Sequence, residues 1–569
     1  MFLPTTREEM KKLKWDELDV ILVSGDAYID SSFNGSAVIG KYLASYGYRV
    51  GIIAQPDIKS ESDITRLGEP RLFWGVSAGC VDSMVANYTA MKKKRMGDDF
   101  TPGGVNNRRP DRAVIAYSNL IKRYFKSGKP IMLGGIEASL RRISHYDYWS
   151  DSVRKSVLFD AKADYLIYGM GEKAVLEFAR AVDEGYGMED IRGLCYISKE
   201  KPEGYIELPS HEEVTKNKDK FIEMFNLFYK NCDAVTAKGL CQKQDTRYLV
   251  QNPPAEVLTT EEIDKVYNLE YEREVHPYYL AQGEVKAMDT IRYSVTTHRG
   301  CYGECNFCAI AVHQGTRIIE RSESSIEQEV KEIASSKKFK GYITDVGGPT
   351  ANMYGIECEK KKKSGRCDHK RCLFPAKCPS MKVNHSKQIK LLKKLASFDG
   401  VKKVFVASGI RYDLIMEDSE CGVRYLKEIV ENHVSGQMKI APEHTVESIL
   451  SYMGKPKAEK LTKFKEAFYK LNQESGKKQF LTYYMIAAHP GCSDKEMKKL
   501  KDYSAKELKV KPEQVQIFTP TPSTYSTLMY YTEKDPFTGK RIFVEKGMKE
   551  KEKQKSILVG DTGKTGGKR

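Results

Sequence analysis

Three cysteines lie close together in the middle of the chain, Cys301, Cys305 and Cys308, in the pattern CxxxCxxC. Three thiolates at this spacing can hold three corners of a cubane iron–sulfur cluster and leave its fourth iron open to bind a substrate. The alternative is a structural zinc site that takes His298 or His313 as its fourth ligand. Zinc sites usually have two paired arms of ligands, whereas these cysteines form one arm, so the spacing favours an iron–sulfur cluster.

The residues on either side of the cysteines predict a strand, a loop and a helix. Residues 292–297 are rich in β-branched and aromatic side chains, which is typical of a strand. Residues 322–337 show helical periodicity, with Ser322 or Ser324 as the N-cap. The cysteines therefore lie on a strand-to-helix loop. In a β/α barrel such loops lie at the carboxyl ends of the strands, where the chemistry takes place.

Strand-like and helical stretches alternate through residues 288–530, and we expect a partial (β/α)6 barrel there. Several of the predicted strands end in small or polar residues, which would face the same side as the cysteine loop. These strand ends include Gly347 to Thr350, Ser408 to Arg411, Ala441 to His444, His489 to Gly491 and Thr519 to Pro522. Each one is also a plausible ordinary turn.

A second group of cysteines lies in a long insertion, residues 349–383, after the second predicted barrel strand. It contains Cys358, Cys367, Cys372 and Cys378, with His369 among them. Four cysteines in a loop that has no hydrophobic core of its own suggest a metal staple, either an auxiliary iron–sulfur cluster or zinc. The spacing matches no standard arm, so the identity of the metal stays open.

Strand-like and helical segments also alternate in residues 1–202, which predicts a Rossmann-like, doubly wound and mostly parallel sheet. Gly134-Gly135 and the loop 169–172 would let a ligand approach the backbone, but neither forms a dinucleotide-binding fingerprint. We expect residues 203–287 to be a connector with a few helices, and residues 531–569 to be a basic, disordered tail.

The composition predicts a soluble protein of two or three domains, because 569 residues exceed one hydrophobic core and 30% of them are charged. No signal peptide or membrane-spanning run is evident, which predicts a cytoplasmic protein whose thirteen cysteines are thiols or metal ligands. The net charge is +16, and Lys540 to Arg569 contain ten basic and four acidic residues. This tail could contact RNA weakly or could simply aid solubility.

The sequence resembles the radical S-adenosylmethionine (radical SAM) superfamily through its CxxxCxxC loop, and most of the chain is similar to the YgiQ-type radical SAM proteins. The segments that carry the second resemblance are Gly25–Asp30, Gly51–Pro56, Gly134–Leu140, Arg299–Cys301, Ile440–His444 and Phe518–Pro522.

The resemblance implies roles for individual residues. Cys301, Cys305 and Cys308 would ligate a 4Fe–4S cluster whose open iron binds S-adenosylmethionine (SAM). Phe307 would pack near the adenine, and the backbone of Gly347 and Gly348 would face the methionine amino group. Pro349 stands where the family has an acidic residue, so no side-chain contact is expected there. Arg411 is a candidate partner for the methionine carboxylate or, alternatively, an exposed loop arginine.

The resemblance also implies the reaction. An electron from a flavodoxin or ferredoxin would reach SAM through the cluster, and the resulting 5′-deoxyadenosyl radical would abstract hydrogen from a substrate that the sequence does not identify. Modification of tRNA or of a protein is one specification, suggested only by the basic charge. The alternative from another class is a non-catalytic zinc or iron–sulfur module that binds nucleic acid.

The first domain resembles the cobalamin-binding domain that precedes some radical SAM barrels. In that domain the pattern Asp-x-His-x-x-Gly supplies a histidine to cobalt, but here it reads Asp30 to Gly35 with Ser32 in place of the histidine. We therefore do not expect this loop to ligate cobalt, nor cobalamin to be a cofactor, although binding without that ligand stays open.

Overall fold

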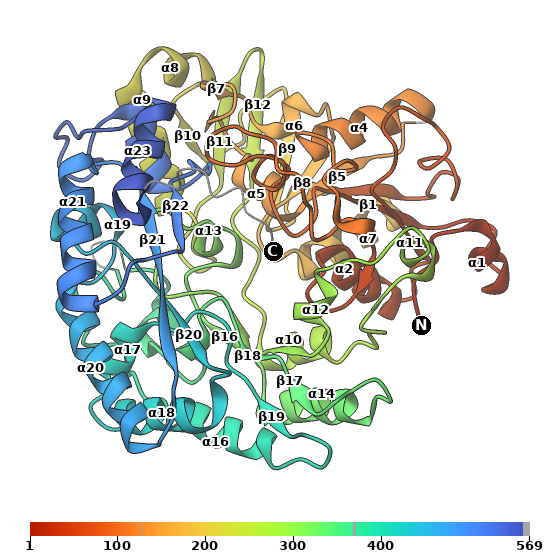
Figure 1. The fold of residues 1–569 in the computed structure, drawn as a ribbon. Helices are drawn as coiled ribbons and strands as arrows, with labels where there is room; N and C mark the ends of the chain where they lie inside the picture. Colours follow the sequence, from red (N-terminus) through yellow and green to blue (C-terminus); the bar gives the residue numbers. More distant parts are fainter. Residues whose placement is uncertain (127, 368–370, 561–569) are drawn as a thin grey trace. The chain divides into compact units, whose positions relative to one another are not determined.

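The chain divides into two compact units in a computed structural model that describes residues 1–126, 128–367 and 371–560 (Figure 1). Unit 1 contains Met1–Arg292 together with the short segments Val312–Gly315 and Thr521–Ser523. Unit 2 contains Tyr293–Ala311, Thr316–Pro520 and the residues from Thr524 onward.

Unit 1 is built on a nine-stranded sheet in the order β10-β11-β12-β9-β8-β5-β4-β1-β3. The five strands from β8 to β3 run parallel, as predicted, whereas β9 is antiparallel to β8 and starts a mixed half. The strands are β1 (Val20–Ser24), β3 (Val50–Ala54), β4 (Phe73–Ser77), β5 (Ile131–Gly134), β8 (Tyr165–Ile167), β9 (Leu194–Ser198), β10 (Ile206–Leu208), β11 (Leu240–Gln244) and β12 (Arg247–Gln251).

Every residue of β1 and β3 is buried, as expected for parallel strands that are covered on both faces. Helix α2 (Gly35–Ser45) contacts β1, β3 and helix α7 (Glu172–Glu184), while α4 (Ala113–Tyr124) and α5 (Gly135–Leu140) pack on β4. The remaining elements of unit 1 are α1 (Arg7–Lys12), β2 (Ile29–Asp30), α3 (Ser83–Asn87), β6 (His145–Asp147), β7 (Ser152–Arg154), α6 (Val157–Asp160), α8 (His211–Lys216), α9 (Lys218–Lys230), α10 (Thr260–Tyr267), β13 (Glu274–Val275), α11 (Pro277–Leu280) and α12 (Met288–Ile291).

Residues 203–287, predicted to be a connector, belong to unit 1 because strands β10, β11 and β12 extend its sheet. Strands β11 and β12 form an antiparallel hairpin whose turn includes Asp245 with a φ of 56°. Several buried positions in this hairpin are glutamines, such as Gln242, Gln244 and Gln251. The sequence of β11 and β12 therefore lacks the alternation of apolar and polar residues that predicts a strand, and the sequence analysis did not predict these two strands.

Unit 2 contains parallel strands that pair in three short sheets. Strand β14 (Ser294–Thr296) pairs with β18 (Asp345–Gly347), β17 (Tyr342–Ile343) with β19 (Lys403–Val404), and β21 (Phe480–Ala487) with both β20 (Gln437–Glu443) and β22 (Val515–Ile517). All of these pairs are parallel, as the predicted β/α units require. The strands do not join into one sheet in the described residues, so the six-stranded barrel stays a prediction.

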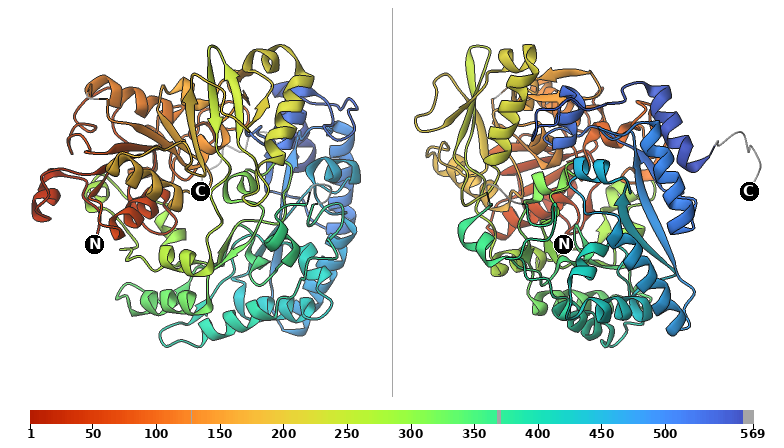
Figure 2. Two further views of the ribbon diagram at one scale, coloured as in Figure 1. Left: turned by 180° about the vertical axis from the view of Figure 1, so that it is seen from behind. Right: turned by 90° about the vertical axis from the view of Figure 1, so that its left-hand side faces the viewer.

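Helices α16 (Ser386–Ala396), α18 (Gly422–Glu428), α20 (Glu459–Glu474) and α21 (Asp494–Tyr503) lie along the outer side of β20 and β21 (Figures 1 and 2). Helix α14 (Glu323–Ser335) begins after Ser322, whose hydroxyl accepts a hydrogen bond from the Ser325 N–H and so confirms one of the two expected N-caps. The other elements of unit 2 are β15 (His298–Arg299), α13 (Ile310–Gln314), whose last three residues belong to unit 1, β16 (Ile319–Glu320), α15 (Glu359–Ser364), α17 (Tyr412–Glu417) and α19 (Glu447–Met453).

The expectation of a disordered tail from residue 531 is wrong for most of that segment. After α22 (Tyr525–Thr532) the chain forms α23 (Met548–Val559). This helix is held mainly by buried polar side chains: the Lys551 ammonium donates to the Tyr530 hydroxyl at 2.9 Å, and Gln554 accepts from the Ala488 N–H and donates to the Cys492 carbonyl. Because polar side chains take the buried positions of this helix, its sequence lacks the regular spacing of apolar residues that predicts a helix. Residues 561–569 lie outside the described part of the chain.

Among the described residues, no helix is both long enough and apolar enough to cross a lipid bilayer.

Candidate functional sites

The three cysteines of the CxxxCxxC motif lie on the loop between β15 and α13, as the sequence predicts. Gly303 lies between the first two thiols. A Cβ atom added there would be 3.2 Å from Cys301 Sγ, 3.6 Å from Cys305 Sγ and only 2.7 Å from Arg411 Nη1. The Gly303 N–H donates to Cys301 Sγ at 3.3 Å. Glycine is therefore needed for the loop to place both thiols and the guanidinium around one point.

The protein surroundings disfavour free thiolates in this loop. Burial raises the pKa of Cys308 to about 12, and the neighbouring charges of Cys305 and Cys301 add to the effect. Burial also raises the pKa of Cys301. A cationic metal centre would lower these pKa values, because a thiol that binds a metal loses its proton. The three buried thiols therefore suit a positively charged inorganic cofactor.

The described residues contain no group of three or more His, Cys, Asp or Glu side chains arranged to hold a metal ion. Each of the two histidines considered as zinc ligands has one ring nitrogen within hydrogen-bond distance of a hydroxyl group. His298 is fully buried with its Nδ1 2.8 Å from Thr297 Oγ1, and burial lowers its pKa to about 4. His313 Nδ1 lies 3.1 Å from Ser139 Oγ, within unit 1. In a cubane each thiolate binds its own iron, so the ligands need not converge on one ion.

Arg411 is buried rather than exposed, and its guanidinium lies beside the cysteines. Its Nε and Nη2 donate to the Asp413 carboxylate at 3.0 and 2.7 Å, while Nη1 is 3.8 Å from Cys305 Sγ. Burial lowers the pKa of Arg411, but the charge of Asp413 outweighs burial and raises it, so the group stays cationic. Asp413 therefore orients a positive charge toward the thiols.

The glycine pair after β18 lies against the same loop. A Cβ on Gly348 would come within 2.7 Å of the His298 ring, so no larger residue fits at this position. The Gly347 carbonyl accepts from the Thr297 N–H at 2.7 Å, which holds the pair to the strand before the cysteines. Thr350, the last residue of this predicted strand end, has its hydroxyl 3.4 Å from Cys301 Sγ.

Phe307 packs beside aromatic side chains from two predicted strand ends. Its ring centroid is 6.4 Å from that of His489, which in turn is 5.1 Å from Phe518. His489 Nε2 lies 2.7 Å from Ser526 Oγ, so the imidazole is fixed in place. These rings form an apolar wall next to Cys308; a role for Phe307 in adenine binding stays a prediction.

Glu443 ends strand β20 and was quoted in the sequence without a role. A register shift in the β20–β21 ladder follows Ile440, and Glu443 has a φ of 69°. Burial raises the pKa of its carboxyl group, only partly offset by the charge of Lys455. The charge of this carboxyl adds slightly to the rise in the pKa of Cys308, so Glu443 lies near the cysteine loop. A backbone in this strained region next to a ligand site indicates a functional position.

In the insertion, Cys372 and Cys378 pack against one small core, Cys358 is buried, Cys367 is half-buried, and His369 lies outside the described residues. Cys80, Cys195, Cys232, Cys241, Cys421 and Cys492 are free thiols outside both groups.

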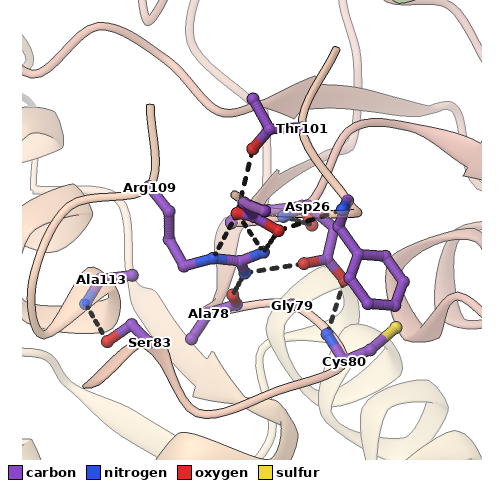
Figure 3. Close-up of polar contacts among 12 residues, drawn as sticks. Asp26, Ala78, Gly79, Cys80, Ser83, Thr101, Arg109 and Ala113 are labelled. Carbon is purple, nitrogen blue, oxygen red and sulfur yellow. Dashed lines mark hydrogen bonds and ion pairs between the residues drawn. The ribbon is translucent and has the colours of Figure 1, made fainter. Parts of the chain in front are cut away.

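In unit 1 the carboxyl ends of β1 and β4 are joined by a buried ion-pair network that the sequence analysis missed (Figure 3). Arg109 Nη1 donates to Asp26 at 2.7 Å and its Nη2 to Asp98 at 3.0 Å, while the Cys80 N–H donates to Asp26 at 2.6 Å. Gly79 has a φ of 101°, and a Cβ there would be 2.2 Å from the Asp26 carboxylate. The network fixes the loops at the edge of the sheet where doubly wound folds bind ligands.

The Asp30–Gly35 segment lies at the same edge of the sheet. The Asp30 carboxylate pairs with Lys41 at 3.0 Å, and Asn34 caps α2 through the N–H groups of Ser36 and Ala37. The Ser32 hydroxyl, at the position of the family's cobalt-ligating histidine, is buried and has no hydrogen-bond partner among the described residues. Gly35 has open space where a Cβ would project.

Comparisons with known proteins agree with the CxxxCxxC motif. A family model described as "Radical SAM N-terminal" matches residues 2–294. The UPF0313 protein FN0734 of Fusobacterium nucleatum is 63% identical over 98% of both chains, and a UPF0313 protein of Thermotoga petrophila is 52% identical over 98% of both chains.

Two solved structures share the fold at low sequence identity. One is the radical SAM methyltransferase TsrM from Kitasatospora setae with cobalamin and a [4Fe–4S] cluster bound, at 14% identity and a TM-score of 0.52 over 89% of this chain and 76% of that one. The other is the cobalamin-dependent SAM radical enzyme OxsB with aqua-cobalamin bound, at 12% identity and a TM-score of 0.51 over 92% of this chain and 57% of that one.

These neighbours correct one expectation. From the missing histidine alone we did not expect cobalamin, but both neighbours bind cobalamin on the fold that this chain shares. The absence of one axial ligand is therefore not a ground for excluding the cofactor. By its relatives and by the family model, this chain belongs to the radical SAM family, within the UPF0313 proteins.

Proposed function

We propose that the chain is a radical SAM enzyme that holds a 4Fe–4S cluster on Cys301, Cys305 and Cys308. The observation that carries the proposal is the grouping of these thiols on one buried loop next to Arg411. When bound, the cluster supplies the electron for reductive cleavage of SAM to a 5′-deoxyadenosyl radical. The non-catalytic zinc module has less support, because the family model that matches residues 2–294 belongs to radical SAM proteins.

The chain's own residues have binding and shielding roles in this proposal. Arg411 Nη1 is not taken by Asp413 and is free to bind the SAM carboxylate beside the cluster. Gly347 and Gly348 expose backbone for the methionine amino group. Phe307 with His489 and Phe518 forms an apolar wall that suits an adenine and keeps water from the reacting atoms. The substrate stays unassigned, and a flavodoxin or ferredoxin is the proposed electron donor.

Anaerobic reconstitution with iron and sulfide tests the proposal. We expect a brown protein with labile sulfide that forms 5′-deoxyadenosine from SAM under dithionite. The Cys305→Ala variant should lose this product at least 100-fold, while Cys421→Ala, a buried thiol of the same unit outside the site, should keep it. A colourless, zinc-loaded protein, or SAM cleavage that survives in Cys305→Ala, would refute the proposal.

A second component of the function concerns unit 1. We propose that unit 1 binds cobalamin without a histidine from the Asp30–Gly35 loop. Support comes from the cobalamin-bound neighbours and from the buried, unpartnered hydroxyl of Ser32 next to the open position at Gly35. A buried polar atom without a protein partner is a candidate contact for a ligand.

Electron paramagnetic resonance of protein-bound cob(II)alamin tests this second proposal. The wild type should show no splitting from a protein imidazole nitrogen, whereas Ser32→His should introduce it. If cobalamin does not co-elute with the wild type in gel filtration, or if Ser32→His leaves the spectrum of the bound cofactor unchanged, the proposal fails.

A further inference from the structure

The insertion after β18 shares a small apolar core with the cysteine loop of the cluster site. This core consists of Tyr302, Ile318, Met353, Ile356, Leu373, Met381 and Leu414. Cys372 and Cys378 of the insertion pack against it, and so does Cys301 of the CxxxCxxC loop. The two groups of cysteines are therefore neighbours within unit 2, separated by a few side chains around Tyr302.

Three thiols of the insertion are gathered at this core. Cys358 is buried, and the Cys378 N–H donates to the Cys372 carbonyl at 2.8 Å. Cys358 follows Ile356 of this core by two residues, and Lys361 Nζ of helix α15 lies 3.7 Å from Cys372 Sγ. Three thiols around one small core are more than packing requires, because one Cys serves as a small hydrophobe as well as three.

Two basic side chains lie beside these thiols. The Lys361 ammonium is buried, 3.2 Å from Glu304 Oε1 and 3.7 Å from Cys372 Sγ. Arg366 pairs with the same carboxylate at 3.2 Å. A zinc ion or a cubane core bound by three thiolates carries a net negative charge, and the buried ammonium beside Cys372 would stabilise it.

The thiols lie on irregular backbone. Of the described residues between α15 and α16, none belongs to a helix or an extended strand, and isolated backbone hydrogen bonds such as that from the Cys378 N–H to the Cys372 carbonyl hold the loop. No three donors are arranged for a metal ion as they stand, and this applies to the cluster cysteines as well. Metal binding and local ordering are coupled in such loops, and the ligands converge when the metal binds.

We infer that the insertion holds a second, thiolate-bound metal centre on Cys358, Cys372 and Cys378, with Cys367 available as a fourth ligand. The centre is either a zinc ion or an auxiliary iron–sulfur cluster, which share this thiolate chemistry. Lys361 lies over the Tyr302 ring, 5.6 Å from its centroid, and links Cys372 to Glu304 of the first cysteine loop.

The inference also explains why the insertion reaches the cluster loop. Arg371 Nη1 donates to the Glu304 carbonyl at 3.1 Å and to Asn306 Oδ1 at 2.6 Å. Lys361 and Arg366 bind the Glu304 side chain, and Glu304 has a φ of 44°. A metal that orders the insertion would hold these basic side chains in place around the loop that carries Cys301 and Cys305.

The test uses full-length protein in which Cys301, Cys305 and Cys308 are all replaced by alanine, purified without oxygen. Elemental analysis and sulfide determination should still find one metal centre per chain. Iron with sulfide identifies a cluster, and zinc without sulfide identifies a zinc site. Adding Cys358→Ala and Cys372→Ala should abolish the metal, whereas Cys421→Ala and Cys492→Ala in the same background should not.

Two results would overturn the inference: no stoichiometric metal in the triple variant, or metal that survives the loss of Cys358 and Cys372. X-ray absorption at the metal edge of the triple variant gives a readout that needs no further substitution. It should show at least three sulfur neighbours, and a shell of only nitrogen and oxygen would also refute the site. Because the triple variant lacks the first cluster, failure of the radical SAM proposal would not change this result.

Discussion

Glu304 in the cysteine loop carries a charge that basic side chains of the insertion compensate. Glu304 lies between two cluster cysteines, is 2% exposed and keeps a lowered pKa because the charges of Lys361, Arg366 and Arg371 outweigh its burial. A buried charge that has lost its partner is costly. Replacing one member of a buried ion pair therefore destabilises the fold by more than the net free energy that the intact pair contributes.

Glu304→Gln should therefore lower the stability of unit 2 by about 3 kcal/mol, because Lys361 and Arg366 lose their counterion. Urea unfolding monitored by far-UV circular dichroism measures the change. Glu359→Gln, an exposed carboxylate of α15, is the matched control and should change stability by less than about 0.5 kcal/mol. Equal effects of the two substitutions would contradict the importance of the buried network.

Arg411 gives a test of SAM binding that depends on geometry as well as charge. Arg411→Lys keeps the charge but loses the fork that binds a carboxylate with two bonds. A charged hydrogen bond is worth about 1.5–3 kcal/mol, so we expect Arg411→Met to raise the KM for SAM by roughly 10–100-fold and Arg411→Lys to recover only part of this loss. Arg424→Met, whose guanidinium contacts Cys421, should leave the KM unchanged. An unchanged KM in Arg411→Met would remove Arg411 from the SAM site.

Asp19 at the start of β1 predicts how the stability of unit 1 depends on pH. Burial raises the pKa of Asp19, but hydrogen bonds from Arg49 and Arg71 outweigh burial and lower it from 3.8 to about 2. The unfolded chain then binds a proton more readily than the folded chain. This contribution to stability is present above pH 4 and is lost as the pH falls from about 4 to about 2.

Asp19→Asn should cost about 1–3 kcal/mol at pH 6, because the two arginines lose a charged acceptor. At pH 2.5 the difference between the variant and the wild type should become much smaller, since the wild-type carboxylate is then being protonated as well. Urea unfolding at both pH values measures the two differences. A difference that is equal at both would show that Asp19 does not titrate as described.

At the level of elements, the sequence predicted the helices and strands that have a regular spacing of apolar residues or a capping residue. Strand β1 and helix α14 with Ser322 as its N-cap were found because both signals are local. Strands β11 and β12 and helix α23 were missed, because buried Gln242, Gln244, Lys551 and Gln554 replace the apolar residues that mark an inward face. Their burial depends on partners far away in the sequence.

In the candidate site, too, the sequence predicted features that depend on neighbouring residues and missed contacts between segments far apart in the chain. The cysteine spacing predicted the three thiols, and they share one loop. The contact of Thr350 with Cys301 and the two cations on Glu304 join segments about fifty or more residues apart, and no local pattern encodes them. Glu443 was visible as a residue, but its burial and strained backbone appear only in the fold.

Helix α23 leads to a prediction about the carboxyl end of the chain. Deleting residues 548–569 should destabilise unit 2 by several kcal/mol, because Leu558 leaves the core and the partners of Gln554 are left buried and unpaired. Deleting only 561–569 removes none of these described contacts and should leave the thermal midpoint within about 1 °C. Thermal unfolding of the two truncated proteins compares them. Similar losses in both would contradict an integral role for α23.

At the level of the whole molecule, the chain has two compact units with separate cores, and each has its own candidate cofactor. A ligand that binds only the folded form of one unit stabilises that unit, by about 2.7 kcal/mol at a hundred times its dissociation constant. Proteins of several domains commonly unfold in more than one step. The two cofactor assignments can therefore be separated by the transition that each ligand shifts.

Anaerobic calorimetry of the reconstituted full-length protein should show that cobalamin raises the midpoint of one transition and SAM that of the other, each by several degrees. The Cys305→Ala variant provides the internal control. It should lose the shift caused by SAM, since the cluster that anchors SAM is absent, but keep the shift caused by cobalamin, since Asp30–Gly35 is untouched. If both ligands moved the same transition, the cofactors would not be divided between the units. If Cys305→Ala abolished both shifts, cobalamin binding would depend on the cluster loop rather than on the sheet edge at Ser32.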